Sequence, residues 1–499
     1  MTDRQAARLL DQAAWGPTPA EIAQVQSQGL SNWIDSQFSA TPSDLPDQPI
    51  LNLMGKGNND LNPVRAALFQ NAVSHPDQLL QRVTFALSQL WVVSQQSGVN
   101  PAYAYPPYWR VLRDNAFKNY ADIIKNVTLN PAMGRYLNMA NNNKGNAARG
   151  TSANENYGRE LMQLFTLGLT QLGTDGSYVL DVSGRPLPTF TEPEVRDLAK
   201  ALTGWTYPTA PGAIEKANNP EYYFGPMRPV AANHDTSKKT VFGGYPILPN
   251  QTPEQDLDSV VQGLMQQPTI APFVCRQLIE HLVTSNPTPA YLQRVSGVFL
   301  NNGSGVRGDM KAVIKAILLD SEARSGDEPT APAMATFGHL REPVLLMANL
   351  LRGLNGAVPS TNGIGNFTSQ LAENIFDEPS VFSYFSPNSR TERGLYGPEF
   401  QIYSTQTSTT RANLIYSALY SGSFGGTTLN LAPFTAKITK VSDPSAMIDY
   451  INYVFLHRSA SPDLIRNATN AAKAAASPAN ATKSALFVML TSAEYQVIH

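Results

Sequence analysis

The sequence predicts a mainly α-helical protein of many helices, with a small β-hairpin element and long ordered loops. Two observations lead to this prediction. In nearly every apolar run outside residues 174–190, hydrophobic residues recur at the spacing of one helix face. The 34 glycines and 37 prolines indicate many ordered turns and loops rather than disorder. With 499 residues, of which 42% are hydrophobic, the chain is long enough to bury a substantial core.

The N-terminal helices are marked by their starts and their breaks. Residues 6–13 have helical spacing, and the sequence Trp15–Pro19 stops the helix. Thr18 and Glu21 have the spacing of a capping box, so a second helix is predicted to start there. Further helical runs follow, separated by prolines or polar turns: 31–38, about 63–74, 79–91, 108–117, 120–129 and 132–139.

The middle of the chain is less regular. Within 174–190, short apolar segments on either side of Ser183–Gly184 predict a β-hairpin. Thr191 and Glu194 form a second capping box at the start of a helix. Residues 206–253 are rich in Pro, Gly and Tyr, and loop regions of this length in compact proteins usually carry function.

From Asp256 the chain is predicted to be mainly helical to its end, apart from a Gly/Ser/Thr-rich stretch at 421–430. We expect a main helical domain over 1–325 and a C-terminal helical part over 326–499 packed on it. The main domain would carry both the 206–253 loop region and the helix that follows Asn154.

A weak internal repeat lies within these two parts. Residues 314–323 resemble 485–495, and each segment follows a Thr-Pro or Ser-Pro helix start, at Thr288 and Ser461. The repeat predicts two related helix-pair units, at about 271–325 and 446–497. We interpret it as a packing unit and not as a site of chemistry.

The composition excludes several classes of function. The 37 basic and 39 acidic residues give a net charge of −2, so nothing favours nucleic acid as a partner. No stretch is apolar over the roughly 18 residues of a membrane span. Cys275 is the only cysteine, which excludes an intramolecular disulfide, and its apolar neighbours predict burial. The six histidines are scattered and no cofactor motif is present, so we assign no metal site and no cofactor.

The segment after Ser152 contains the first candidate catalytic residues. Ser152 and Glu155 have capping-box spacing, and Glu155 can pair with Arg159 on the outer face of the helix. Glu160 lies about 60° from Tyr157, on the border of the apolar stripe. Partial burial there raises the pKa of a carboxyl group, which suits a general acid. A purely structural role for Glu160 is the alternative. Its cationic partner would come from elsewhere, with Lys239, Arg276 and His234 as candidates.

The 206–253 region supplies further candidates. His234 and Asp235 could be a base with its orienting carboxylate or two metal ligands, or a loop held by turn hydrogen bonds. Aromatic residues grouped in loops can stack on sugars. Val381–Asn388 is a second aromatic segment, which suits core and site equally. We assign substrate binding to Asn156, Arg159, Lys239, Trp205, Tyr207, Tyr222 and Tyr223.

The run Asn154–Gly168, NENYGRELMQLFTLG, resembles the signature of the bacterial domain-of-unknown-function 1800 family. Three further segments resemble the same family: Ala7–Thr18, Thr191–Trp205, and His234–Asp235 with Lys239 and Gly243. Members are typically large exported proteins without an established activity, so the resemblance implies a secreted or periplasmic protein whose leader is absent. Many members carry a Trp-His-Asn-His-Phe-like run where this chain has Leu87–Val93 without histidine, so no metal role is carried over.

Together these features predict a secreted or periplasmic enzyme that acts on an extracellular polymer, namely a polysaccharide hydrolase. A carboxylic acid would protonate the leaving oxygen and a carboxylate would act as the base. Glu160 is the first choice for one of them, with Asp235 or Glu155 for the other. A non-catalytic envelope binding or assembly protein, and a metal-dependent hydrolase that uses His234 and Asp235, are the alternatives.

Overall fold

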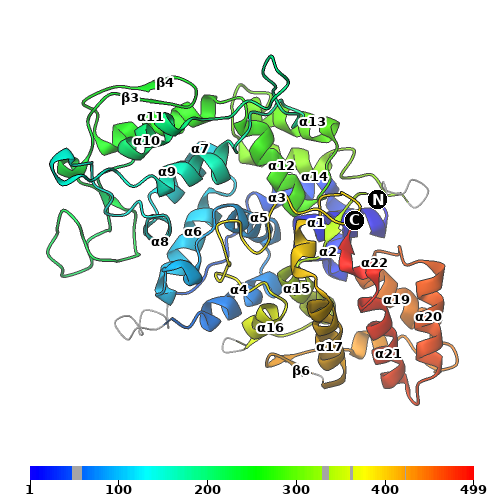
Figure 1. Cartoon of the computed structure of the whole chain (residues 1–499). Helices are drawn as coiled ribbons and strands as arrows, with labels where there is room; N and C mark the ends of the chain where they lie inside the picture. The colour runs from blue at the N-terminus through cyan, green and yellow to red at the C-terminus, as the bar shows by residue number, and fades with distance from the viewer. Residues whose placement is uncertain (48–58, 329–335, 360–362, 422) are drawn as a thin grey trace.

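The computed structural model describes residues 1–47, 59–328, 336–359, 363–421 and 423–499. Helices dominate these residues, and the strands are two or three residues long and pair antiparallel, two by two (Figure 1). The predicted mainly α-helical fold is therefore confirmed. Within the described residues, none of the helices combines the length and the apolarity needed to cross a membrane.

The N-terminal helices form the centre of the molecule in Figure 1. Their bounds are α1 (Asp3–Ala13), α2 (Pro19–Gln28), α3 (Leu30–Gln37), α4 (Asn62–Ser74), α5 (Gln78–Leu90), α6 (Tyr105–Asn115), α7 (Tyr120–Thr128) and α8 (Pro131–Tyr136). Each residue of α5 is buried, and the helix packs against α1, α3, α6 and α12. It is the central helix around which the others are arranged.

The second group of helices lies above the centre in Figure 1. It comprises α9 (Asn156–Glu160), the π-helix η5 (Leu161–Thr166), α10 (Glu192–Ala201), α11 (Pro253–Gln266), α12 (Ile270–Leu282), α13 (Pro289–Leu300) and α14 (Met310–Leu319). The 206–253 region lies over this group and contains β1 (Trp205–Thr206), β2 (Arg228–Pro229), β3 (Lys239–Val241) and β4 (Tyr245–Ile247). Cys275 of α12 is buried, as its apolar neighbours predict.

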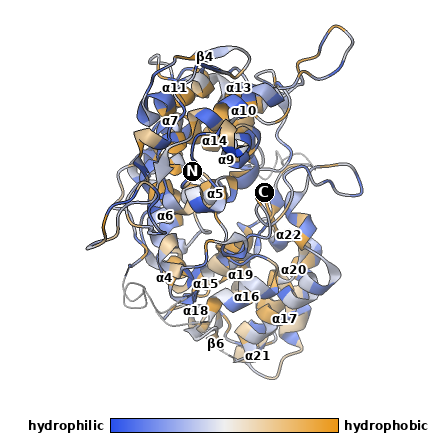
Figure 2. Ribbon diagram, turned by 60° about the vertical axis from the view of Figure 1, so that its left-hand side comes forward, coloured by the Kyte–Doolittle hydropathy of each residue, from blue (hydrophilic) through white to orange (hydrophobic). Residues whose placement is uncertain are grey.

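The C-terminal helices extend from the centre to the lower end of the molecule in Figures 1 and 2. They are α15 (Pro343–Gly353), α16 (Ile364–Gln370), α17 (Thr405–Ser421), α18 (Ala432–Thr435), α19 (Ser445–Leu456), α20 (Pro462–Lys473), α21 (Pro478–Leu490) and α22 (Ala493–Gln496). The remaining strands are β5 (His339–Leu340), which pairs with β8 (Val497–Ile498), and β6 (Ser423–Phe424), which pairs with β7 (Thr427–Thr428). One continuous apolar core extends from α1 to β8.

The hairpin predicted over 174–190 forms beside α13 (Figure 1). The Val179 N–H donates to Gln171 O at 2.9 Å and the Leu187 N–H donates to Val179 O at 2.9 Å, so three short antiparallel segments meet. Side chains at its tip are exposed, among them Tyr178, Leu180 and Val182. The prediction of a local hairpin is correct, and residues 169–172 add a third segment.

The two helix-pair units have the same hydrogen-bonding pattern at the start of one of their helices. At the start of α13, the Thr288 N–H donates to Glu322 at 3.0 Å, and the Thr288 hydroxyl donates to the same carboxylate. At the start of α20, the Ser461 N–H donates to Glu494 at 2.8 Å, and its hydroxyl donates at 2.5 Å. In each unit, a glutamate a few residues beyond α14 or α21 therefore accepts hydrogen bonds from the residue that begins an earlier helix.

Candidate functional site

The signature segment, residues 154–168, is built differently from the prediction. Helix α9 begins only at Asn156, and no side chain caps it, so the predicted Ser152–Glu155 capping box is absent. The Asn154 side chain instead accepts a hydrogen bond from the Asn156 N–H at 2.9 Å. From Leu161 the helix widens into η5, a π-helical turn of the kind often found at functional sites.

Glu155 and Arg159 lie on the outer side of this segment. Arg159 bonds Glu155 at 3.1 Å and Glu192 of α10 at 2.8 Å, and all three side chains are partly exposed. Exposed ion pairs of this kind contribute little to stability. They join α9 to α10.

Glu160 is half-buried, and its Oε2 atom has no hydrogen-bond partner among the described residues. Burial raises its pKa, and the nearby charge of Arg159 opposes this effect only in part. Burial and the charges of Glu378 and Glu160 raise the pKa of Tyr136. The raised pKa agrees with the position of Glu160 at the border of the apolar stripe.

The candidate cations for Glu160 all have other carboxylate partners. Lys239 Nζ lies 2.6 Å from Asp256 Oδ2, and His234 Nε2 lies 3.2 Å from the same oxygen. Arg276 Nε lies 2.8 Å from Glu280. The expected cluster of Glu160 with His234 and a lysine is therefore not formed.

His234, Lys239 and Asp256 make a buried polar cluster. Their side chains are at most 1% exposed, and His234 Nδ1 lies 2.9 Å from Thr203 O. Gly204 has φ +84°, and a Cβ there would lie 2.9 Å from the Cβ of His234, so only glycine fits. The cluster fixes the loop region onto α11 and offers no access to substrate.

Asp235, the neighbour of His234, closes a turn. Its Oδ1 accepts hydrogen bonds from Ser237 N–H at 2.9 Å and Ser237 Oγ–H at 2.5 Å. Partial burial opposes ionisation, but these bonds outweigh it and lower the pKa of Asp235. A carboxylate with a lowered pKa is a weak base, which does not suit general-base chemistry.

The predicted aromatic residues pack mostly on one another. Tyr223 lies between Tyr103 and Tyr207, with ring centroids 5.5 and 6.1 Å away, and it is almost fully buried. Tyr222 packs against Phe224 at 5.8 Å. Trp205 is buried in β1. Of the four aromatic residues chosen from the sequence, Tyr207 is the one that lines a cleft described below.

The asparagine cleft is a polar pocket of about 440 Å³ beside the signature segment. It is lined by Gly134, Arg135, Asn138, Ala140, Asn141, Asn142, Asn143, Lys144, Thr151, Ser152, Asn154 and Tyr207. Asn156, a predicted binding residue, donates to Asn138 Oδ1 at 3.1 Å at its edge. The Oδ1 atom of Asn143 is buried without a partner among the described residues. Amide-rich walls suit a neutral ligand with many hydroxyl groups.

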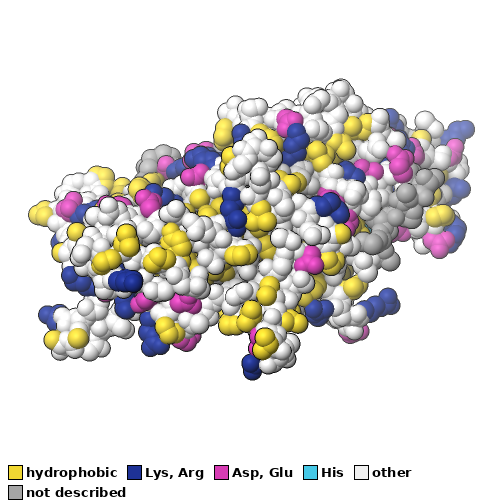
Figure 3. Space-filling view, turned by 90° about the horizontal axis from the view of Figure 1, so that it is seen from above, with side chains coloured by type: hydrophobic (Ala, Val, Ile, Leu, Met, Phe, Trp, Pro, Cys, Tyr) yellow, Lys and Arg dark blue, Asp and Glu magenta, His cyan; other side chains and the backbone are white. Residues whose placement is uncertain are grey.

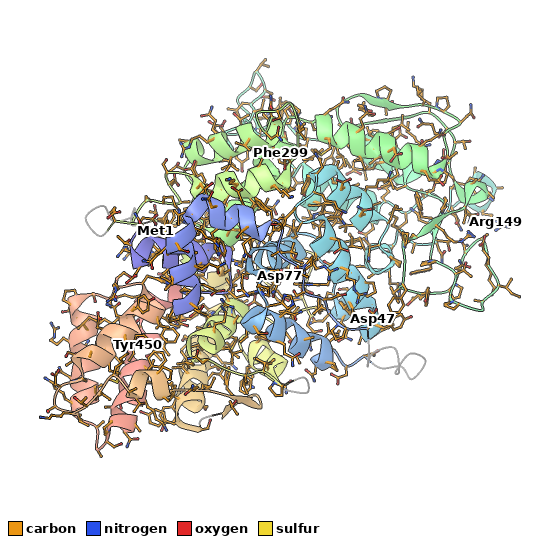
Figure 4. The ribbon with its side chains drawn as sticks, turned by 180° about the vertical axis from the view of Figure 1, so that it is seen from behind. Met1, Asp47, Asp77, Arg149, Phe299 and Tyr450 are labelled. Atoms are coloured by element: carbon orange, nitrogen blue, oxygen red, sulfur yellow. The ribbon has the colours of Figure 1, made fainter. Side chains whose placement is uncertain are left out.

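This cleft lies at one end of the molecule. Arg149 lies in the sequence between the cleft residues Lys144 and Thr151, and it lies at the opposite end of the molecule from Tyr450 of α19 in Figure 4. Charged side chains are scattered among uncharged ones on the face shown in Figure 3. The view agrees with the low content of charged residues, 15% of the chain.

The carboxyl cleft is a second, narrower pocket of about 50 Å³, space for a few water-sized groups. It is lined by Gln89, Leu90, Leu164, Gln277, Glu280, His281, Val381, Phe382, Ser383, Phe385, Pro387, Pro398 and Glu399. These residues come from α5, η5, α12 and the segments around 381–399. The aromatic segment Val381–Asn388 therefore forms one wall of a cleft.

Two glutamates with strongly shifted pKa values line this cleft. Burial raises the pKa of Glu280 to about 7; the ion pair with Arg276 opposes the shift, and the charge of Glu399 adds to it. Burial also raises the pKa of Glu399 to about 7, although the Ser285 hydroxyl bonds its carboxylate at 3.4 Å. At neutral pH the pair can therefore hold one proton between two carboxyl groups.

Further buried titratable groups surround the pair. Gln89 donates to Glu342 Oε2 at 2.8 Å, and Glu373 accepts a bond from the Val344 N–H at 2.7 Å. Burial and the adjacent Glu342 raise the pKa of Glu373 well above its usual range. Burial lowers the pKa of His281 to about 4 and keeps its imidazole neutral. Such a concentration of perturbed groups is typical of functional sites.

Ser383 lies in the wall of the carboxyl cleft in a strained conformation. Its φ is +67°, a value that non-glycine residues rarely adopt, and its Oγ is buried without a partner among the described residues. The turn is closed by Ser383 N–H donating to Ser380 O at 3.1 Å. Strained residues with unpaired groups concentrate at functional sites.

The signature segment connects the two clefts. Its first residue, Asn154, lines the asparagine cleft, and Leu164 of η5 lines the carboxyl cleft. Glu160 lies between them on the same continuous helix. The segment that is most unusual in the sequence thus contributes one residue to each cleft.

Sequence reasoning missed Glu280, His281 and Glu399. One signal was present, because Arg276 and Glu280 are charged residues four apart in the otherwise apolar helix Ile270–Leu282. Nothing local distinguishes Glu399, which is brought to the cleft by the tertiary fold. Within the described ranges, no three His, Cys, Asp or Glu side chains form a group that could hold a metal ion.

Comparison with known proteins gives a family but no activity. A family model described as a protein of unknown function (DUF1800) matches residues 8–497, nearly the whole chain. No curated protein and no solved structure matches the chain.

Proposed function

Because the chain belongs to the DUF1800 family, whose activity is unknown, we propose a function from the site itself: a secreted or periplasmic hydrolase that cleaves a polysaccharide. The observation that carries the proposal is the pair Glu280 and Glu399, each with a pKa of about 7 in one cleft. This pair replaces Asp235 and Glu155 as candidates for acid and base.

The chemistry of such a pair fits glycosidic hydrolysis. One carboxylic acid donates a proton to the leaving oxygen, and one carboxylate removes a proton from the attacking water. The carbon–oxygen bond to the leaving sugar breaks, and a new bond to the water oxygen forms. General acid or base catalysis by a placed side chain contributes about 10²–10⁴-fold in rate.

The surroundings of the two glutamates suggest their roles. Arg276 bonds Glu280 at 2.8 Å, and a cation favours the ionised form of a carboxyl group. Among the described residues, Glu399 forms no ion pair with an arginine or lysine: Ser285 bonds it, His339, whose pKa burial lowers to about 4, lies 3.5 Å away, and the charge of Arg82 acts on it without a direct contact. We therefore assign the base to Glu280 and the acid to Glu399.

Two features support a sugar polymer as the substrate. The asparagine cleft offers amide donors and acceptors for hydroxyl groups, and Tyr207 supplies an aromatic side chain. The signature segment runs from this cleft to the carboxyl cleft, and Glu160 lies between them. A chain molecule bound along this segment would contact both clefts, whereas a small metabolite would need only one.

The test is release of reducing ends from a panel of polysaccharides, followed by the variants Glu280→Gln and Glu399→Gln. Each variant should lower kcat by about 10²–10⁴-fold. Glu399→Gln should keep the melting temperature within a few degrees, because it replaces a protonated acid by a neutral amide, whereas Glu280→Gln should lower it, because Arg276 loses its carboxylate partner. Glu254→Gln, an exposed residue of α11, is the matched control. Full activity in both pair variants would overturn the assignment.

A non-catalytic carbohydrate-binding protein is the second candidate. The asparagine cleft favours it, because its 440 Å³ would hold a sugar, whereas the carboxyl cleft encloses only about 50 Å³. This function predicts that a polysaccharide binds, that Asn143→Ala weakens binding, and that no reducing ends appear. The double variant Glu280→Gln/Glu399→Gln would then bind like the wild type.

A further inference from the structure

A third cleft meets the carboxyl cleft at the Arg276–Glu280 ion pair. It has a volume of about 380 Å³, and Arg276, Arg390, Tyr396, Asn286, Asp175 and Ser177 are among the residues that line it. Glu280 lines the carboxyl cleft, and its partner Arg276 lines this one, with Nε and Oε1 2.8 Å apart. A ligand that extends from one cleft into the other would therefore lie against this ion pair.

Two arginines meet over one tyrosine in this cleft. The Cζ atom of Arg276 lies 4.5 Å from the ring centroid of Tyr396, and the Cζ atom of Arg390 lies 4.0 Å from it. The ring is held in place because the Tyr396 N–H donates to Asn286 Oδ1 at 2.9 Å and Asn286 Nδ2 donates to Tyr396 O at 2.8 Å. Both guanidinium groups therefore make cation–π contacts with the ring of Tyr396.

The positive charge of Arg390 is not neutralised within the described part of the chain. Its guanidinium donates to Gly394 O and to the Tyr396 hydroxyl, both at 2.7 Å, and both partners are neutral. No carboxylate lies within ion-pair distance of it among the described residues, and its side chain is exposed to solvent. A guanidinium in this state presents N–H groups to an incoming ligand.

Asp175, an acidic residue of the same cleft, forms no ion pair with Arg390 among the described residues. Asp175 is engaged by Ser177, whose hydroxyl and N–H donate to it at 2.6 and 3.0 Å. Arg390 is therefore the arginine of this cleft without a carboxylate partner among the described residues, whereas Arg276 is paired with Glu280. Guanidinium groups bind carboxylate and sulfate oxygens in a two-pronged geometry that lysine does not provide.

We propose that this cleft binds an acidic group of the polymer, a sugar carboxylate or a sugar sulfate, through Arg276 and Arg390. The proposal rests on the proposed function and narrows its substrate class to acidic polysaccharides. The acidic sugar would lie next to the unit whose bond is cleaved, because Arg276 is bonded to Glu280.

The test is calorimetric titration of the full chain with two pairs of probes in low salt. The first pair is trigalacturonic acid and its methyl ester, and the second is a sulfated galactose oligosaccharide and its desulfated form. We expect one acidic probe to bind at least about tenfold more tightly than its neutral form, a difference of about 1.4 kcal/mol. The preference should be lost in Arg390→Gln and kept in Arg466→Gln, an exposed arginine of α20.

The outcomes separate this proposal from the proposed hydrolysis. A preference for the acidic probe that depends on Arg390, without any release of reducing ends, supports the anion site and refutes the hydrolase. Cleavage of acidic and neutral polymers at equal rates, which Arg390→Gln does not change, supports the hydrolase and refutes the anion site. Equal affinity for each acidic probe and its neutral form, or a preference that survives Arg390→Gln, also refutes the anion site.

Discussion

Glu280 and Glu399 reach one cleft from distant parts of the chain, and both are carboxyl groups with a pKa near neutrality. Burial raises each pKa to about 7, and the charge of Glu399 adds to the shift of Glu280. Because the two groups interact, they titrate as a pair. The protonation states of these two groups set the pH range in which the site can act.

The pair predicts a bell-shaped dependence of activity on pH. Below pH 7 both groups become protonated and the base is lost, and above pH 7 both become ionised and the acid is lost. The initial rate of reducing-end release, measured from pH 5 to 9 at constant ionic strength, should therefore peak near pH 7. A rate that stays level over this range would contradict the assignment.

Glu378 should destabilise the folded protein at high pH. Burial raises its pKa to about 7, against about 4.3 in the unfolded chain, so the folded state binds more protons between these values. The free energy of unfolding then falls as the pH rises through this range. Glu378→Gln keeps an acceptor for the Tyr384 hydroxyl, which bonds Glu378 at 2.8 Å. We expect the variant to be more stable than the wild type by about 1–3 kcal/mol at pH 8.

At pH 4.5 the same variant should match the wild type, because Glu378 is then protonated in the folded protein. Urea denaturation at both pH values measures the difference. The variant and the wild type contain the same buried histidines, so the contribution of these histidines to the pH dependence cancels in the difference between the two proteins. An equal difference at pH 4.5 and pH 8 would show that the carboxyl group does not titrate as stated.

The buried cluster around Asp256 should matter for stability and not for turnover. Asp256→Asn leaves the buried ammonium of Lys239 without its carboxylate, a change that costs about 3–5 kcal/mol in comparable cases. Asp258→Asn on the same helix breaks an exposed pair with Lys125 and should change stability by less than about 1 kcal/mol. Urea unfolding measures the stability change in both variants. A loss of activity per folded molecule in Asp256→Asn would show that this cluster contributes to the candidate site.

Glu160 and Glu155 should respond differently to the same substitution. Glu160→Gln removes a half-buried carboxyl group between the two clefts, so polymer turnover should fall while the melting temperature changes by only a few degrees. Glu155→Gln loses one exposed ion pair with Arg159 and should alter neither property. Normal kinetics in Glu160→Gln would make this residue a structural one.

The parts of the fold that follow local rules were predictable. Thr18 with Glu21 and Thr191 with Glu194 form the capping boxes that their spacing predicts, because a cap depends on neighbours within one turn. The hairpin near Ser183–Gly184 also depends on local turn chemistry. These features needed no knowledge of tertiary structure.

The candidate site depends on contacts that local patterns do not contain. The Ser152–Glu155 pattern fits a cap, but the chain enters the helix later, and the π-helical turn at Leu161 shifts the side chains that follow. The pKa of Glu399 is raised by burial against segments that are distant in the sequence. In the sequence, His234 and Lys239 have the features of catalytic loop residues. In the structure both side chains are buried and paired with Asp256 of α11, a contact that the local sequence does not reveal.

Arg276 is shared by two clefts, and this sharing has a thermodynamic consequence. An anion that draws the guanidinium away from Glu280 removes the interaction that opposes the rise of its pKa, while Glu399 still favours the protonated form. Anion binding would therefore increase the proton affinity of Glu280. By reciprocity, protonation of Glu280 would increase the affinity for the anion by the same factor. The protein would then hold an acidic polymer more tightly in acidic surroundings than in alkaline ones.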